Sequence, residues 1–175
     1  MIVYGIIYQG GVMFGIGILP VSTSGSQGMR QDISGSTIQE ILSEPEYRTI
    51  HYALVPDDLE SIAKQMINWA DDIDIDLIVS TGGTGLGQQD VTPEACLSII
   101  DKEVPGLAEA MRAKSLEITP MAMLSRSVCG VRGTTRIITL PGSPKGVKET
   151  LEVIKPVLPH ALELLNKASV NEHPV

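Results

Sequence analysis

Apolar positions along the chain change their spacing repeatedly, which predicts that strands and helices alternate. Four short apolar runs are typical of strands: residues 14–21, TIHYALV, IDLIVST and TTRIITL. The third run is nearly continuous and ends in glycines, as expected for a strand that is buried on both faces. Each run is followed by a turn or loop that contains Gly, Ser or Pro.

Segments with helical spacing lie between these runs. In DDLESIAKQMINWADD, the apolar side chains that begin with Leu59 and Ile62 fall on one face of a helix. STIQEILSE, TPEACLSIIDK and PGLAEAMRAKSLE predict three more helices. A last helix is expected to reach about Leu165, with a break or kink at Pro156 and Pro159.

Polar residues at the starts of these helices predict how they are capped. Asp57 and Glu60 fit a capping box before the first long helix. Thr92 and Ser143 each precede a proline, a pattern typical of an N-cap followed by proline at the first helical position. We therefore expect helices to begin at these three places.

Alternating strands and helices predict βαβ units, and therefore a mostly parallel sheet that is covered by helices on both faces. In such sheets, ligands bind outside the carboxyl ends of the strands. Three loops leave those ends, at residues 22–35, 82–90 and 142–146, and all three are rich in Gly and Ser. A candidate site is expected where they meet.

The length and hydropathy of the chain predict one domain. Its 175 residues are 43% hydrophobic, which suffices for a single core, expected at residues 14–167. Residues 1–13 are expected to form an N-terminal extension and residues 168–175 a flexible tail. The first 21 residues are uncharged and could be read as a membrane span. Their glycines, Gln9 and the lack of a basic flank instead favour an extension followed by a strand, with no membrane anchor.

Composition and charge exclude some classes of protein. Aromatic residues make up 3% of the chain and the net charge is −8, and neither value is typical of a protein that binds nucleic acid. Cys96, Cys129 and the three histidines are not at zinc-ligand spacing. Two cysteines do not make a disulfide framework, so we expect reduced thiols in a cytoplasmic protein.

The stretch TGGTGLGQQDVTPEA, residues 81–95, combines four glycines with an acid, Asp90. It lacks the lysine of a P-loop and the glycine spacing of a dinucleotide-binding turn. Successive glycines let amide N–H groups converge on an anion, and a carboxylate tolerates a neighbouring phosphate when Mg²⁺ lies between them. The alternative is a plain strand-to-helix turn in which Asp90 caps the loop. The residues alone leave both interpretations open.

Five segments, in order, resemble the molybdopterin adenylyltransferase family, which includes the MoaB and Mog proteins and the gephyrin G domain. They are PVSTSGSQGMRQDISG, TGGTGLGQQDVTPEA, VPGLAEAMR, ITPMAMLSRSVCGVRG and ITLPGSPKGVKE. The resemblance implies a three-layer α/β/α sandwich, usually a homotrimer, that binds molybdopterin and Mg-ATP. It also implies transfer of AMP from ATP to the terminal phosphate of molybdopterin, with release of pyrophosphate. The product would then go to a molybdenum insertase, the implied partner.

The resemblance also implies roles for residues at matching positions. Asp90 and Asp57 would be the catalytic acids and would hold Mg²⁺. Glu109 and Arg112 would lie near the nucleotide, and Ser125 where the pterin is held. The other implied substrate-binding residues fall in the three loops: Ser22, Ser24, Asp32, Ser34 and Gly35, then Gly82, Gly83, Thr84 and Gly85, then Gly142, Ser143 and Pro144.

Two positions depart from the family pattern. Thr23 stands where the family usually has Asp, and Gln89 stands where it usually has Arg. Losing the carboxylate would change a metal or pterin contact, and losing the arginine would remove a phosphate partner. These departures leave an alternative open, a non-catalytic molybdopterin carrier or assembly protein of the same fold. Arg126, between two serines, can be read as a plain loop residue.

Overall fold

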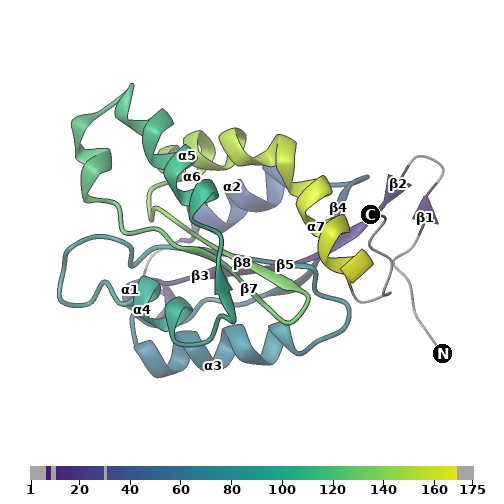
Figure 1. Cartoon of the computed structure of the whole chain (residues 1–175). Helices are drawn as coiled ribbons and strands as arrows, with labels where there is room; N and C mark the ends of the chain where they lie inside the picture. Colours follow the sequence, from purple (N-terminus) through teal and green to yellow (C-terminus); the bar gives the residue numbers. More distant parts are fainter. Residues whose placement is uncertain (1–6, 9–10, 30, 169–175) are drawn as a thin grey trace.

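A six-stranded sheet forms the centre of the molecule (Figure 1). The structure, a computed structural model, describes residues 7–8, 11–29 and 31–168. The strands lie in the order β4-β3-β5-β8-β7-β6. Their bounds are β3 Phe14–Pro20, β4 Tyr47–Tyr52, β5 Leu77–Thr81, β6 Lys102–Glu103, β7 Cys129–Arg132 and β8 Thr135–Leu140.

The prediction of a mostly parallel sheet is confirmed. Strands β4, β3, β5 and β8 pair in parallel, whereas at one edge β7 pairs antiparallel with β8 and β6 pairs antiparallel with β7. The periodicity did not predict β7. It pairs with β8 through a two-residue loop that starts at Gly133, whose φ of 56° suits such a turn.

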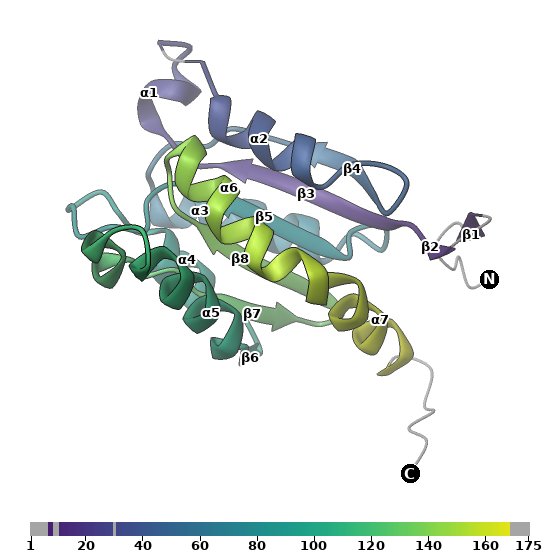
Figure 2. The same cartoon turned by 90° about the horizontal axis from the view of Figure 1, so that it is seen from above.

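Helices cover both faces of the sheet, so the three-layer sandwich is confirmed (Figures 1 and 2). One face packs against α2, α5, α6 and α7, which span Ile33–Ile41, Pro105–Leu116, Pro144–Ile154 and Leu158–Ala168. The other packs against α3 (Leu59–Ala70) and α4 (Thr92–Leu97). Successive strand residues alternate between the two cores, as in Ile78, which faces α3, and Val79, which faces α2.

Shorter elements complete the chain. These are α1 (Thr23–Ser26), η1 (Pro120–Leu124) and η2 (Lys155–Val157). The turn η2 contains Pro156 and separates α6 from α7, so the predicted break is confirmed. Before the domain, β1 (Ile7–Tyr8) and β2 (Gly11–Val12) pair antiparallel. The rest of the expected extension, and the expected tail beyond residue 168, lie outside the described residues.

Two predicted helix caps are wrong. The N-cap of α3 is Asp58, whose Oδ2 accepts from the N–H of Ser61 at 2.8 Å, and not Asp57. The N-cap of α4 is Val91, and Thr92 is the first helical residue. In each case the chain enters the helix one residue away from the position that the pattern indicates. The predicted cap at Ser143 is confirmed, because its Oγ accepts from the N–H of Gly146 at 3.1 Å.

No helix within residues 7–8, 11–29 and 31–168 is long and apolar enough to cross a membrane.

Candidate functional site

The three glycine- and serine-rich loops meet at the carboxyl edge of the parallel strands (Figure 2). Three hydrogen bonds tie them together. Thr81 Oγ1 donates to Pro141 O at 2.6 Å, and the N–H of Gly82 donates to Leu140 O at 3.2 Å. Ser34 Oγ donates to Gly142 O at 2.8 Å. The expected convergence of the loops is therefore built into the fold.

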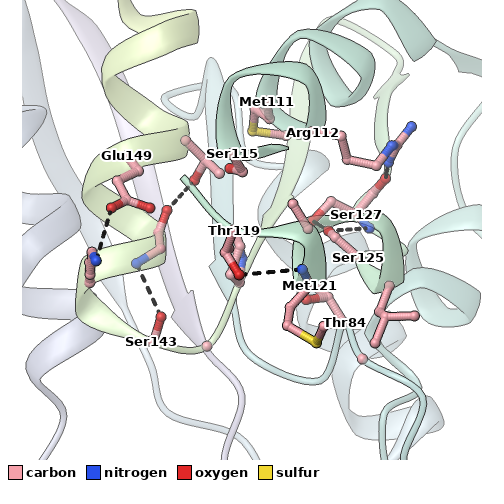
Figure 3. A pocket seen from close by; sticks show the side chains of 18 of the residues that line it. Thr84, Met111, Arg112, Ser115, Thr119, Met121, Ser125, Ser127, Ser143 and Glu149 are labelled. Carbon is pink, nitrogen blue, oxygen red and sulfur yellow. Dashed lines mark hydrogen bonds and ion pairs between the residues drawn. The ribbon is translucent and has the colours of Figure 1, made fainter. Parts of the chain in front are cut away.

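A cavity of about 660 Å³ lies on one side of the joined loops (Figure 3). Its walls come from residues 82–90, called the glycine loop below, from the end of α5 with η1, and from the start of α6. Asp90, Arg112, Lys145 and Glu149 are its charged lining residues. Apolar side chains such as Met111 complete the wall, so the cavity can take a ligand that is partly apolar and partly anionic.

A smaller cavity of about 410 Å³ lies on the other side of the loops. Ser22, Asp32 and Ser34 contribute polar groups to it. Gly83, Gly142 and Ser143 line both cavities. At this border an added Cβ on Gly142 would lie 3.2 Å from Gly82 Cα, so the two loops touch through their main chains. The glycine backbone at Gly82 and Gly142 therefore forms part of the border between the two cavities.

The glycine loop requires glycine at its start. Gly82 and Gly83 have φ angles of 101° and 63°, in the left-handed region where other residues are strained. A Cβ on Gly82 would clash with Val21 O, and one on Gly83 with Thr92 Oγ1. The amide of Gly82 is already bonded to Leu140, so it is not available to a ligand. Among the described residues, the amides of Gly83, Thr84 and Gly85 have no hydrogen-bond acceptor.

The carboxylate of Asp90 both caps the loop and faces the larger cavity. Its Oδ2 accepts from the N–H of Gly87 at 2.7 Å. A Cβ on Gly85 or on Gly87 would lie 2.8 Å from the same oxygen, so the loop folds closely around this carboxylate. Asp90 can therefore cap the loop through Oδ2 and still offer Oδ1 to a metal ion, because Oδ1 has no hydrogen bond to any described group.

Asp57 lies apart from both cavities. Its Oδ2 accepts from the N–H of Thr23 at 2.7 Å and from Thr23 Oγ1 at 2.9 Å. Asp57 is absent from the lining of either cavity. In the described part of the chain, no group of three or more His, Cys, Asp or Glu side chains could hold a metal ion.

Several other predicted residues of the first loop support its structure. Asp32 is the N-cap of α2: its Oδ1 accepts from the N–H of Gly35 at 2.9 Å, and its Oδ2 accepts from Tyr52 Oη. Burial and the Asp32 carboxylate raise the pKa of Tyr52, so Tyr52 stays protonated as a donor. Gly35 is buried, and a Cβ there would clash with Tyr52 Oη. Ser24 Oγ lies 3.3 Å from Ser22 Oγ.

Of the residues predicted on α5 and in the loop that follows it, two line a cavity and one does not. Arg112 and Ser125 line the same larger cavity, and Arg112 Nη1 donates to Ser127 O at 3.0 Å (Figure 3). Glu109 is exposed and lines neither cavity. Pro144 begins α6 and lines the smaller cavity.

Some site residues were not among those predicted. Ser115, Thr119 and Glu149 line the larger cavity (Figure 3). Arg126 contacts the glycine loop through three hydrogen bonds, one from its main chain and two from its side chain. A helix face that turns toward a cavity leaves no distinct pattern in the sequence. The only feature of the sequence that could have indicated a role for Arg126 is its position between two serines that follow η1.

The fold and site define an α/β/α protein with two adjoining cavities at the carboxyl edge of its sheet. The model of the family described as probable molybdopterin binding domain matches residues 17–160. The chain belongs to this family.

Named relatives and solved structures agree with the family match. A molybdopterin adenylyltransferase of Helicobacter pylori strain J99 is 42% identical over an alignment of 161 residues, and the match covers 90% of this chain and 92% of that protein. Gephyrin of Dictyostelium discoideum is 41% identical, over 86% of this chain and 22% of its own length. The crystal structure of the molybdopterin biosynthesis enzyme MoaB from Thermus thermophilus has a TM-score of 0.83 and 53% identity, and the match covers 87% of this chain and 96% of that one.

Proposed function

We propose that this protein is a molybdopterin adenylyltransferase of molybdenum cofactor biosynthesis. It binds molybdopterin and Mg-ATP, transfers AMP to the terminal phosphate of molybdopterin and releases pyrophosphate. The observation that carries this proposal is the pair of cavities that meet at Gly83, Gly142 and Ser143. Two substrates that occupy adjoining cavities can bring their phosphates together at this border, and such alignment is a large part of catalysis between two bound reactants.

The larger cavity supplies the charges that phosphates need. Arg112 and Lys145 contribute cations to its lining. The free amides of Gly83, Thr84 and Gly85 are donors of the kind that bind phosphate oxygens. The cap at Ser143 starts α6 at the same border, and the N-terminal end of an eleven-residue helix favours an anion there. These groups offset the repulsion between two anionic substrates.

The residues present fit Mg²⁺, because this ion is usually held by one or two carboxylates together with substrate phosphates. Asp90 offers an oxygen that bonds no described group, and it lies beside the phosphate-binding amides. Asp57 is a weaker candidate ligand, since Thr23 already occupies one of its oxygens. When bound, Mg²⁺ would neutralise charge on the phosphates at the point of transfer.

The chemical step needs no nucleophile from the protein. An oxygen of the molybdopterin phosphate attacks the α-phosphorus of ATP, and the bond from that phosphorus to the bridging oxygen of pyrophosphate breaks. The attacking phosphate is already ionised, so no base has to remove a proton. The residues of the loops therefore act by holding and orienting the two phosphates, and by stabilising the charge of the transition state.

An assay of molybdopterin-dependent pyrophosphate release from Mg-ATP tests the proposal. The wild-type protein is expected to turn over, and Asp90→Asn is expected to lower the rate by about 100-fold. The Asn side chain keeps an acceptor for the N–H of Gly87, so the loop stays folded. Glu152→Gln, at an exposed position of α6, is the matched control and should leave the rate unchanged. Near-normal turnover by Asp90→Asn would refute the role of Asp90.

Calorimetry separates this enzyme from a non-catalytic carrier. Titration with Mg-ATP, alone and with molybdopterin, is expected to show nucleotide binding. Molybdopterin binding without any nucleotide binding would instead support the carrier.

We further propose, from the family resemblance, that the protein is a cytoplasmic homotrimer and passes its product to a molybdenum insertase. Light scattering after size exclusion measures the oligomer, and a monomer would contradict this proposal.

A further inference from the structure

Arg126 binds the glycine loop both before its tip, at Thr84 and Gly85, and after it, at Asp90. Its main-chain N–H donates to Thr84 O at 3.0 Å, and its Nε donates to Gly85 O at 2.7 Å. Its Nη2 donates to Asp90 O at 2.5 Å. Gly85 and Asp90 lie on opposite sides of the exposed tip of the loop, at residues 86–89. One guanidinium group therefore bridges the entry and the exit of this tip.

The loop has few other contacts that could fix its shape. Within it, the N–H of Asp90 donates to Gly87 O at 3.0 Å, and the N–H of Gly87 donates to the Asp90 carboxylate. Glycines have no side chains to pack and have wide conformational freedom, so contacts from outside the loop add substantially to its order. Arg126 provides these contacts from the segment that also carries Ser125 and Ser127 in the wall of the larger cavity.

Glu94 holds the remaining part of the guanidinium. Arg126 Nη1 donates to Glu94 Oε1, and Glu94 lies in the first turn of α4. The Arg126 guanidinium keeps the pKa of the Glu94 carboxyl below its usual value, so this carboxylate is charged at neutral pH. Arg126 is thus anchored to a helix at one edge and presents its other donors to the two loop carbonyls.

We propose that Arg126 is a positioning residue for adenylyl transfer. It fixes the main chain at Gly85 and Asp90, so that the Asp90 carboxylate faces the larger cavity in a single arrangement. The hydrogen bonds of Arg126 all go to protein groups, so Arg126 acts on the reaction through Asp90. The inference rests on the proposed function, because only that function gives the placement of Asp90 its chemical importance.

The shape of arginine explains why this residue type is needed. The guanidinium is planar and rigid, with donors that point in fixed directions to two carbonyls and one carboxylate. A lysine ammonium places its charge at one point on a flexible stem, so it cannot bridge Gly85 and Asp90 in the same way. Arg126→Lys should therefore recover charge with Glu94 and only part of the order of the loop.

Steady-state kinetics of Arg126→Gln and Arg126→Lys test this inference. Arg126→Gln is expected to lower kcat by about 10- to 100-fold, with the Kd for molybdopterin unchanged. Arg126→Lys is expected to fall between Arg126→Gln and the wild type. The matched control is Arg132→Gln, because Arg132 also donates to a loop carbonyl, Ile99 O at 3.0 Å, and lies 3.5 Å from an Asp71 carboxylate oxygen. Unlike Arg126, Arg132 makes its contacts with Ile99 and Asp71 and not with the glycine loop, so its loss should leave kcat unchanged.

Amide hydrogen exchange of residues 82–90, without substrates, supplies a second readout. Exchange is expected to accelerate about tenfold in Arg126→Gln and to stay unchanged in Arg132→Gln. If the wild type does not adenylylate molybdopterin, the proposed function fails, and the exchange data still show whether Arg126 orders the loop. If the wild type turns over and Arg126→Gln has the same kcat and loop exchange, the inference about Arg126 is overturned and the proposed function stands. A loss of kcat with unchanged loop exchange would also overturn it.

Discussion

The carboxylate of Asp57 and the side chain of Thr23 bind each other at the start of α1. Asp57 Oδ2 accepts from the Thr23 hydroxyl at 2.9 Å, and this hydroxyl accepts in turn from the N–H of Asp57 at 3.1 Å. The pair joins the loop after β3 to the loop after β4. An aspartate at position 23, which the resemblance implies for the family, would set two carboxylates against each other, whereas Thr23 gives Asp57 a donor.

Replacing Thr23 by Val should destabilise the protein. Valine keeps the shape of threonine and removes the hydroxyl, so Asp57 loses one donor and its N–H loses its acceptor. We expect the free energy of unfolding to fall by about 1–2 kcal/mol, as for a lost hydrogen bond to a charged group. Urea denaturation measures the change. Thr23→Ser keeps the hydroxyl and should stay close to the wild type, and equal stability of Thr23→Val and wild type would contradict the importance of this pair.

Replacing Gly82 by Ala should destabilise the fold strongly. Gly82 has a φ of 101°, and an added methyl group would clash with the main-chain oxygen of Val21. We expect a loss of at least about 2 kcal/mol, because backbone strain and a clash with main chain add. The control is Gly106→Ala in α5, where nothing lies within 4 Å of the added Cβ. That change should be neutral or stabilise by up to about 1 kcal/mol, and the contrast is measured by urea denaturation.

The ion pair between Arg126 and Glu94 should make stability depend on pH. The pKa of Glu94 is lowered in the folded state from its ordinary value of 4.5, chiefly by the hydrogen bond from Arg126. A lowered pKa means that the unfolded chain binds the proton more readily. The stabilisation is therefore complete above pH 4.5 and is lost as the pH falls through the lower pKa of the folded state.

Melting temperatures of the wild type and Glu94→Gln between about pH 7 and pH 3 check this expectation. The wild type should melt higher at neutral pH, and the difference should disappear in acid. A difference that stays constant over this range would show that the charge of Glu94 is not the cause.

The two cysteines should resist thiol reagents in the folded protein. Burial raises the pKa of Cys96 and of Cys129 to about 12, so almost no thiolate is present at about pH 8. Both are buried. A chromogenic disulfide reagent is expected to react slowly with the native protein and promptly with two thiols per chain in denaturant. Prompt native reaction would mean that α4, which carries Cys96, or β7, which carries Cys129, opens readily.

Strand and helix order follow from the sequence because they depend on local spacing. The apolar run of β3 and the apolar stripe of α3 appear directly in the residues, and each indicates which side chains can reach a core. The antiparallel edge at β7 was missed because its pairing depends on a short turn at Gly133 and on the position of β8. The cap of α3 was misplaced by one residue because the neighbouring Asp58 fits the same local pattern. At α4 the helix begins at Thr92, and its N-cap Val91 makes no side-chain hydrogen bond that a pattern could indicate.

The sequence by itself determined the class of the site: glycine-rich loops after parallel strands, an acid among them, and a family resemblance that the match over residues 17–160 confirms. Tertiary structure alone decided how these parts combine. It divided the site into two cavities with a glycine border, turned Asp57 toward Thr23, and brought Arg126 to Gly85 across 41 positions. The physical reason is that local spacing reports which residues share a face, whereas a cavity or a bridging guanidinium depends on distances between segments that only the packed sheet brings together.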